Sequence, residues 1–381
     1  MSDRLLVVGV DTPTPPFLAQ LLRGLRDRGR RVTIAAARPA DPGLADDWLP
    51  IPPGTGLPLR AAAGLAVRRP VRAVRATRPL AAGARSRLHD QILRTVDTDV
   101  VYVPWIAHAV DRPALFDGGA PVLVSCRGSQ VNVAPQNPRR RSLAAGLADV
   151  FARSAGVHCV SDAIRDVAGG FGLDPGRATV IRPGVDLHRF TPDEDRRGDG
   201  PLRLLIVGTL TWRKGVEYAA IGARRALDAG IDLRLDLVGA ERDGGAARHA
   251  VHDLGLDGVT TFHGALEPDQ VPLRLRAADA VLVPSVTEGI ANAALEAMAT
   301  RRAVVVTSVG GMEEVVTDGV DGLVVAPREP EAIAAAIIEL AEPGRRDRLA
   351  AAGRRRVEEA FGLDDHVDAF ARLLDATAGT S

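Results

Sequence analysis

Short apolar runs alternate with amphipathic helical patterns along most of the chain, and this alternation restricts the fold more than any other feature. Repeated strand–helix–strand units form parallel sheets that are covered by helices on both faces. The 381 residues are enough for two such domains. We therefore expect an α/β protein with two doubly wound, Rossmann-like domains.

The first series of elements starts with a strand at Leu5–Val10 and a proline-rich loop at Asp11–Pro16. A helix follows, with leucines at positions 18, 21, 22 and 25 on one face, and Gly29 closes it. The same pattern predicts five further strands in this half of the chain: Val32–Ala36, Val100–Val103, Val122–Cys126, Val157–Val160 and Thr179–Ile181.

A second series of strands begins after residue 201 and defines the other domain. We predict a first domain over 1–188 and an exposed linker over 189–200, which is rich in charge, proline and glycine. The second domain covers 201–361, and a terminal helix over 362–381 has an apolar stripe. The predicted strands of the second domain are Leu202–Val207, Leu233–Val238, Val259–His263, Ala280–Val283, Ala303–Thr307 and Gly322–Val325.

Composition excludes several classes of protein. Lys+Arg and Asp+Glu both total 48, so no net charge favours nucleic acid as a partner. The two cysteines, Cys126 and Cys159, end apolar runs and are expected as buried thiols in a reducing compartment. The first residues do not resemble a signal peptide, and no segment is long and apolar enough to span a membrane. These features predict a cytoplasmic location.

The loop Gly208–Gly215, with the sequence GTLTWRKG, follows the first strand of the second domain and leads into a helix near Val216. Ligands of open parallel sheets bind at such strand ends. Lys214 is the single lysine among the 48 basic residues, and the adjacent Arg213 adds a second positive charge. With the free N–H groups of a helix start, these cations suit a diphosphate. The same residues also fit an exposed basic turn.

The segment 285–299, SVTEGIANAALEAMA, places two glutamates eight positions apart after an apolar strand. Glu288 precedes a helix that starts near Ala291–Asn292, and Glu296 lies one to two turns inside it. Carboxylates accept hydrogen bonds from sugar hydroxyls, and the helix start offers donors to phosphate oxygens. Two solvated glutamates on an alanine-rich helix are the alternative, which Gly289 makes less favourable by interrupting the helical pattern.

These segments together resemble the retaining glycosyltransferases of family 4, which have the GT-B fold of two facing Rossmann-like domains with a cleft between them. The resemblance is dense from about residue 157 to 340 and weaker before 150. Besides the two segments above, it includes VIRPGVDLHRF at 180–190, LVGA at 237–240, FHGAL at 262–266 and SVGGMEEVVTDGVDGLVV at 308–325.

The resemblance implies that Glu288 contacts the donor sugar and that Glu296 binds the nucleotide ribose. It implies that Lys214, with Arg213, neutralises the leaving diphosphate without a metal ion or other cofactor. The base is expected near the backbone of Ala265 and Leu266. The other donor-binding positions implied are Gly208, Thr209, Gly239, Gly289, Ile290, Ala291, Asn292 and Leu295, while Asp186, Gly310 and Gly311 match turn residues of the family.

The sequence departs from the family pattern at three places. Thr209 stands where family members carry an arginine, and we expect Arg213 to take its place from the other side of the turn. The stretch DTPTPP at 11–16 replaces a glycine-rich loop. Arg127 replaces a histidine and is predicted to reach a phosphate or an acceptor from across the cleft, with a structural role as the alternative.

The resulting hypothesis is a retaining, metal-independent hexosyltransferase that moves a sugar from a nucleotide sugar to an acceptor hydroxyl on a small molecule, a glycan or a lipid-linked compound. A non-catalytic, nucleotide-sugar-binding partner subunit is one alternative, and a nucleotide-sugar epimerase is another. A nicotinamide-dependent oxidoreductase is disfavoured because no G-x-G-x-x-G follows the first strand.

The segment 60–94 is basic, with seven arginines between positions 68 and 87 and no acidic residue before Asp90. It predicts peripheral contact with the inner face of a membrane or with an acidic acceptor. A solvated helical face is the alternative interpretation.

Overall fold

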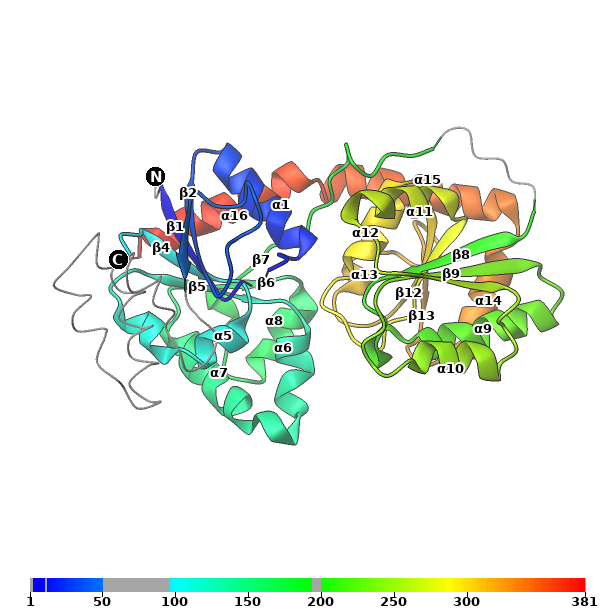
Figure 1. Ribbon diagram of the computed structural model, residues 1–381, viewed down its shortest axis with the longest axis horizontal. Coiled ribbons are helices and arrows are strands. Elements are labelled where there is room, and N and C mark those ends of the chain that lie inside the picture. The colour runs from blue at the N-terminus through cyan, green and yellow to red at the C-terminus, as the bar shows by residue number, and fades with distance from the viewer. Residues whose placement is uncertain (1–2, 11, 51–92, 94–95, 194–199, 381) are drawn as a thin grey trace. The chain divides into compact units, whose positions relative to one another are not determined.

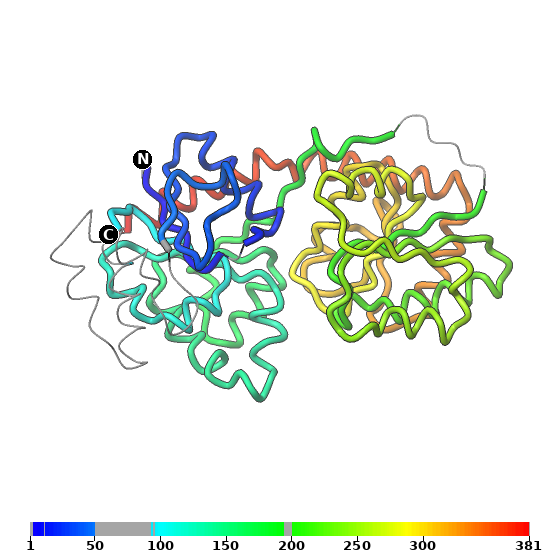
Figure 2. Tube along the Cα trace, in the orientation of Figure 1, coloured from blue at the N-terminus to red at the C-terminus, as the bar shows by residue number. Residues whose placement is uncertain are grey.

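The computed structural model describes residues 3–10, 12–50, 93, 96–193 and 200–380 (Figure 1). Most of the basic segment 60–94, part of the predicted linker and Asp11 lie outside the described residues. The described chain divides into two compact units. Unit 1 contains residues 1–159, 165–181 and 367–381, and unit 2 contains residues 160–164 and 182–366. Each unit is a parallel sheet with helices on both faces, as the strand–helix alternation predicts (Figures 1 and 2).

Unit 1 has a seven-stranded parallel sheet in the order β3-β2-β1-β4-β5-β6-β7. The chain moves outward from β1 in one direction and then returns to β4 on its other side, so the order reverses between β1 and β4. The strands are β1 (Arg4–Val8), β2 (Arg31–Ala36), β3 (Asp47–Pro50), β4 (Val100–Val103), β5 (Val122–Cys126), β6 (Gly156–Cys159) and β7 (Ala178–Val180).

The helices of unit 1 bury leucine-rich or aromatic faces against this sheet. In α1, all four leucines of the predicted apolar stripe are 0 or 1% exposed. The other helices are α5 (Ile106–Val110), α6 (Ser129–Asn132), α7 (Arg141–Arg153), α8 (Asp162–Gly169) and α16 (Leu363–Ala378), and α1 is Pro16–Asp27. The last helix packs through Phe370, whose ring lies 5.1 Å from the ring centroids of both Tyr102 and His158.

Unit 2 has a six-stranded parallel sheet in the order β10-β9-β8-β11-β12-β13, and its order reverses between β8 and β11. All strands pair with an in-register parallel neighbour, apart from an irregularity near Phe262 in β10. The strands are β8 (Leu202–Val207), β9 (Leu233–Val238), β10 (Thr260–Gly264), β11 (Ala280–Val283), β12 (Ala303–Thr307) and β13 (Leu323–Val325).

Helices cover both faces of the unit 2 sheet, and each face has its own core. Figure 1 shows α9, α10 and α14 on one side and α11, α12 and α15 on the other. The bounds of these helices are α9 (Val216–Asp228), α10 (Ala246–Asp253), α11 (Val271–Ala277), α12 (Asn292–Ala299), α13 (Met312–Val315), α14 (Pro330–Leu340) and α15 (Pro343–Ala360). Phe190, inside the stretch predicted as a linker, is 3% exposed and packs in the core that contains α12.

One strand was missed by the sequence analysis, and several predicted strand ends shift by one or two residues. The missed strand, β3, has the sequence DWLP, which is too short to show an alternating pattern. It forms because the preceding Asp46 accepts a hydrogen bond from the Val32 backbone and Trp48 Nε1 donates to the Ala36 carbonyl. The first strand ends at Val8 and not at Val10, since Gly9 has a φ of 83°.

The two cysteines are adjacent in the sheet of unit 1, where Cys126 of β5 is in register with Cys159 of β6. Both are buried as thiols. Hydrogen bonding with Cys159, together with burial, raises the pKa of the Cys126 thiol well above its ordinary value. These thiols therefore behave as core residues.

Phe370 connects α16 to the sheet of unit 1, and truncating it tests this attachment. Phe370→Ala removes a fully buried ring, so we expect the free energy of unfolding to fall by about 3–5 kcal/mol. Denaturant unfolding of the full chain measures the change. Leu273→Ala, at a position that is 58% exposed, is the control. Equal stability of the two variants would contradict the packing described here.

Candidate donor-binding site in unit 2

The predicted donor-site residues of unit 2 gather where the strand order reverses. The loop Gly208–Gly215 leaves β8, and the loop 284–291 leaves the neighbouring strand β11. The backbone N–H of Val286 donates to the Arg213 carbonyl at 2.8 Å and joins the two loops. In open parallel sheets, ligands bind at this kind of switch point, beyond the carboxyl ends of the strands.

Lys214 and Glu288 form an ion pair across these two loops. Lys214 Nζ donates to Glu288 Oε1 at 2.7 Å, and Ser285 Oγ donates to the same oxygen at 3.1 Å. The Lys214 and Glu288 side chains are 21% and 19% exposed, so the pair is partly screened from solvent and still reachable. Thr307 Oγ1 fixes the Ser285 carbonyl at 2.6 Å. The structure thus brings together two residues that are 74 positions apart.

Glycine is required at two points that hold the Glu288 loop in place. A Cβ atom at Gly310 would lie 2.2 Å from the Glu288 carbonyl oxygen, and Gly310 has a φ of 57°. A Cβ atom at Gly215 would lie 2.0 Å from the Pro284 carbonyl oxygen. The backbone N–H of Gly311 donates to the Gly289 carbonyl at 2.6 Å. These contacts fix the Glu288 backbone from below, as expected for turn residues.

The cation beside Lys214 is Arg213, and its guanidinium has no hydrogen-bond or ion-pair partner within the described part of the chain. The side chain is half-buried, in a short 3-10 turn that ends at Gly215. A partly buried guanidinium without a carboxylate retains its full capacity to bind phosphate oxygens. Thr209, where family members carry an arginine, is exposed directly after β8.

Glu296 lies in the second turn of α12 and has the largest pKa change among the predicted site residues. Burial raises the pKa of its carboxyl to about 7, and the positive charges of Arg189 and Lys214 oppose this rise. Arg189 was not among the residues predicted from the sequence. The only sequence signal for it is its place in the VIRPGVDLHRF segment, where Asp186 Oδ1 caps the backbone N–H groups of His188 and Arg189.

The remaining predicted positions supply backbone and packing more than polar side chains. Gly239 has a φ of 142°, and a Cβ atom there would lie 1.9 Å from the Gly208 carbonyl oxygen. Ala265 is exposed and Leu266 half-buried, directly after β10. At the start of α12, Ala291 and Leu295 are 3% and 1% exposed and belong to the core, whereas Ile290 and Asn292 are half-buried.

Arg127, the other predicted catalytic residue, lies in unit 1 directly after β5. Its Nη2 donates to Tyr102 Oη at 2.8 Å, and its guanidinium carbon lies 4.8 Å from the centre of the Phe17 ring. No carboxylate pairs with it among the residues that the structure describes. Like Arg213, it is therefore a cation with no carboxylate partner in the described part of the chain.

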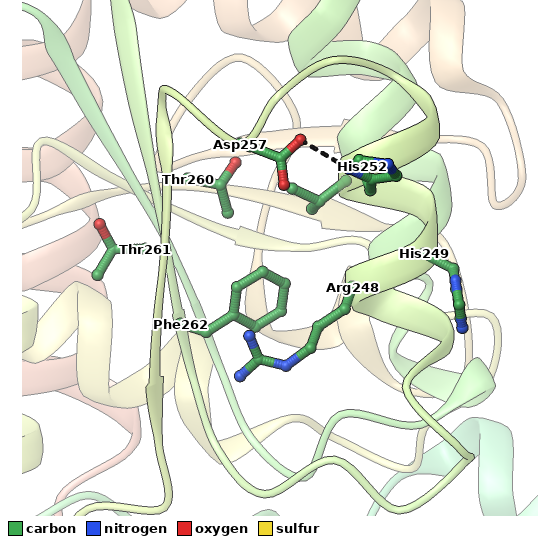
Figure 3. Close-up of a pocket in the computed structure, with 8 residues that line it drawn as sticks. Arg248, His249, His252, Asp257, Thr260, Thr261 and Phe262 are labelled. Carbon is green, nitrogen blue, oxygen red and sulfur yellow. Dashed lines mark hydrogen bonds and ion pairs between the residues drawn. The ribbon is translucent and has the colours of Figure 1, made fainter.

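The cavity drawn in Figure 3, of about 600 Å³, lies elsewhere in unit 2, between α10 and the edge strand β10. None of the predicted site residues lines it. Two of its basic side chains already have partners, since Arg248 pairs with Glu241 and lies over the Phe262 ring, and His252 is hydrogen-bonded to Asp257. The switch point, with Arg213 and Lys214, therefore remains the candidate donor site.

The described part of the chain also bears on metal binding and on membranes. Within these ranges, no three His, Cys, Asp or Glu side chains are grouped so that they could hold a metal ion. No described helix combines the length and the apolar character that crossing a membrane requires.

Two models of known protein families match parts of this chain. A family model described as Glycosyl transferases group 1 matches residues 201–343, and one described as Glycosyltransferase Family 4 matches residues 17–189. The fold and the two matched families thus place the chain in the GT-B class of glycosyltransferases. The chain has a glycosyltransferase group 1 domain and a glycosyltransferase family 4 domain.

Relatives by sequence include the D-inositol 3-phosphate glycosyltransferase of Geodermatophilus obscurus, 34% identical over 234 residues, which cover 57% of this chain and 51% of the relative. The glycogen synthase of Mycobacterium tuberculosis is 34% identical over 197 residues, 50% of this chain and 46% of the relative. The chain thus spans about half the length of the curated relatives that it matches.

Two solved structures share the fold over nearly the whole chain. Sucrose-phosphate synthase from Thermosynechococcus elongatus has a TM-score of 0.79 at 21% identity and covers 100% of both chains. Anabaena HepE, solved with UDP and glucose, has a TM-score of 0.76 at 16% identity and covers 98% of this chain and 99% of its own.

The raised pKa of Glu296 predicts a pH-dependent stability. The folded chain holds a proton on this carboxyl up to about pH 7, whereas the ordinary pKa is 4.5. Keeping the Glu296 carboxyl protonated therefore stabilises the fold fully below about pH 4.5. This stabilisation is lost as the pH rises to about 7. Relative to Glu296→Gln, we expect the wild-type free energy of unfolding to fall by about 1–3 kcal/mol across this window.

Denaturant unfolding of both proteins at several pH values measures this difference. Glu359→Gln, at an exposed position of α15, is the matched control for the change from acid to amide. A difference between wild type and Glu296→Gln that stays constant from pH 4.5 to 7 would show that the carboxyl is not desolvated as described.

Proposed function

We propose that this chain is a retaining glycosyltransferase that transfers a sugar from a nucleotide diphosphate to an acceptor hydroxyl. The observation that supports this most is the Lys214–Glu288 pair at the switch point of unit 2, with Arg213 beside it. In this proposal, residues 201–361 form the donor-binding domain. Residues 1–188, completed by the helix at 362–381, form the acceptor-binding domain.

The donor is held through its diphosphate and its ribose. When the anomeric C–O bond breaks, negative charge builds on the diphosphate, and preorganised cations lower the barrier for that step. Lys214 and Arg213 provide these cations without a metal ion. In the structure, Lys214 is neutralised by Glu288 at 2.7 Å, so the incoming diphosphate competes for the ammonium group. Glu288 is then released to accept hydrogen bonds from the sugar hydroxyls.

Glu296 accepts hydrogen bonds from the ribose hydroxyls, and its position near Lys214 and Arg189 places ribose and diphosphate next to each other. The backbone after β10, at Ala265 and Leu266, is assigned to the base. UDP is the first nucleotide to test, because HepE was solved with UDP. In this scheme, Gly208 and Gly239 allow the backbone to approach the phosphates closely.

The acceptor is proposed to carry an anionic group that Arg127 binds in unit 1. This assignment rests on the absence of a carboxylate partner for Arg127 among the described residues. D-inositol 3-phosphate is a suitable first acceptor, since several relatives are named for this substrate. Glycogen, named by another relative, lacks a phosphate and is the contrasting acceptor to test.

The basic segment 60–94 is proposed to contact either an anionic membrane or an acidic acceptor, with a solvated surface as the alternative. Sedimentation of the full chain with anionic and with neutral vesicles separates these possibilities. Binding to anionic vesicles that is lost on neutralising Arg68, Arg69 and Arg72 would support the membrane contact. Absence of binding to both kinds of vesicle would exclude the membrane contact.

Lys214→Ala tests the proposed chemistry directly. We expect the rate of nucleoside diphosphate release to fall by about 10²–10³-fold, because one preorganised charge that stabilises the leaving group is lost. The assay uses a panel of sugar nucleotides with D-inositol 3-phosphate, and NMR of the product reports whether the anomeric configuration is retained.

Arg225→Ala is the control, since it removes an exposed cation of the same unit that pairs with Glu331 on α14. Unchanged turnover in Lys214→Ala would disprove the assignment of the leaving-group cation. An inverted product would disprove the retaining mechanism. Binding of a nucleotide sugar without turnover on any acceptor would favour the partner-subunit alternative, and a changed donor sugar without acceptor would favour an epimerase.

A further inference from the structure

A single chain of hydrogen bonds runs through the core of unit 1 and ends on Arg127. Arg127 Nη2 lies 2.8 Å from Tyr102 Oη, which lies 3.0 Å from Ser125 Oγ. Ser125 Oγ lies 2.8 Å from His158 Nδ1, and His158 Nε2 lies 2.9 Å from the Ile181 carbonyl oxygen. This series of hydrogen bonds thus connects Arg127 with the backbone of Ile181, the residue after β7.

The three side chains inside this chain come from neighbouring strands and are closed to solvent. Tyr102, Ser125 and His158 belong to β4, β5 and β6, and they are 0, 1 and 0% exposed. Phe370 of α16 lies against the rings of Tyr102 and His158. Polar groups buried to this degree destabilise the fold unless they are hydrogen-bonded, so each hydrogen bond of this series contributes to stability.

The donor and acceptor in each of these hydrogen bonds follow from the group at the end of the series, the Ile181 carbonyl. The Ile181 carbonyl can only accept, so His158 Nε2 carries a hydrogen and Nδ1 of the neutral ring accepts. Ser125 therefore donates its one hydrogen to His158, and Tyr102 must donate to Ser125. The Tyr102 oxygen then accepts a hydrogen bond from the Arg127 guanidinium.

The alternative, a charged His158, does not fit this chain. A proton on Nδ1 would make His158 donate to Ser125, and the bond between Ser125 and Tyr102 could then run in either direction. In both cases one of the two hydroxyl hydrogens would have no acceptor among these hydrogen bonds, because Arg127 can only donate. A charged ring would also place a second buried positive charge in the same series of hydrogen bonds as the guanidinium. A neutral ring with its hydrogen on Nε2 gives every hydrogen in the series an acceptor.

Arg127 is held on its other side by an aromatic face. Its guanidinium carbon lies 4.8 Å from the centre of the Phe17 ring, and Phe17 is in edge contact with Trp105 at 6.3 Å. Its Nε is buried and has no hydrogen-bond partner among the described residues. The guanidinium is thus fixed from two directions, while the charge itself is not neutralised by any carboxylate in the described chain.

We infer that Tyr102, Ser125 and His158 are positioning residues, whose directed hydrogen bonds hold Arg127 as a preorganised binding group for a phosphate or carboxylate of the acceptor. This inference rests on the proposed function for the identity of the ligand. It goes further in naming three buried residues that act on the ligand only through Arg127. A guanidinium that is already oriented loses less conformational entropy when it binds an anion.

Tyr102→Phe is the sharpest test, because it removes one oxygen and keeps the ring that packs on Phe370. The probe is inorganic phosphate, titrated into the isotope-labelled full chain while NMR follows the Arg127 Nε–H signal. We expect the variant to shift this signal and to weaken phosphate binding by about tenfold, as for one hydrogen bond to a charged group. Tyr218→Phe, which changes the other tyrosine of the chain, is the matched control.

Two further readouts separate a positioning role from a purely structural one. The imidazole nitrogen shifts of His158 should report a neutral ring with hydrogen on Nε2. In the double variant Tyr102→Phe with Arg127→Lys, phosphate affinity should equal that of Arg127→Lys alone, since Tyr102 acts only through Arg127. If Tyr102→Phe does not fold, Ser125→Ala interrupts the same chain one step further away and takes its place.

The inference is overturned by a His158 ring that is charged or carries its hydrogen on Nδ1. It is equally overturned if Tyr102→Phe leaves both the Arg127 signal and the phosphate affinity unchanged. A wild-type chain that does not respond to phosphate would instead refute the anion-binding role proposed for Arg127. In that case the His158 shifts and the Arg127 signal in Tyr102→Phe would still decide whether the positioning chain exists.

Discussion

The ion pair between Lys214 and Glu288 is the interaction on which the proposed donor site depends. It joins the loops after β8 and β11, the two strands between which the order of the unit 2 sheet reverses. Because both loops start from buried parallel strands, their positions are set by the core below them. The sheet therefore fixes a cation and a carboxylate at hydrogen-bond distance, although 74 residues separate them in the chain.

In the proposed function, the ion pair lets one site serve two ligand groups. In the structure, the lysine and the glutamate neutralise each other, which limits the cost of partly burying two charges. A diphosphate that takes over the lysine leaves the glutamate available to the sugar hydroxyls. The glycines at 215 and 310 let the neighbouring backbone pack directly against the Pro284 and Glu288 carbonyls, where any side chain would clash.

The sequence was informative where function depends on local spacing and less so where it depends on tertiary contact. The two series of strands, the E-x₇-E segment and the single lysine could be read directly, because each is a short-range pattern. Strand β3 was missed since its sequence is too short to show an alternating pattern, and only pairing with β2 makes it a strand. Arg189 was missed because its nearness to Glu296 arises from folding across about a hundred residues.

Unit 1 shows the same limit more strongly. Arg127 was identified from a departure from the family pattern, but its hydrogen-bonded partners could not be, since Tyr102, Ser125 and His158 each lie in an apolar strand and look like ordinary core positions. Only the pairing of β4, β5 and β6 brings their polar atoms within hydrogen-bond distance of one another. Hydrogen bonds between buried polar side chains on adjacent strands therefore cannot be predicted from the sequence and require the strand order of the sheet.

The central claim, that unit 2 holds a nucleotide sugar at the switch point, is tested most directly by ligand-induced stabilisation. Thermal unfolding of wild type and Glu296→Ala would be followed with UDP, GDP, ADP, their sugars and NAD, each at about 100 times a plausible dissociation constant. Under these conditions, a ligand that binds only the folded state stabilises it by about 2.7 kcal/mol. The account predicts stabilisation by one nucleoside diphosphate and its sugars, and its loss in Glu296→Ala. No response to any sugar nucleotide, or a response to NAD alone, would contradict it.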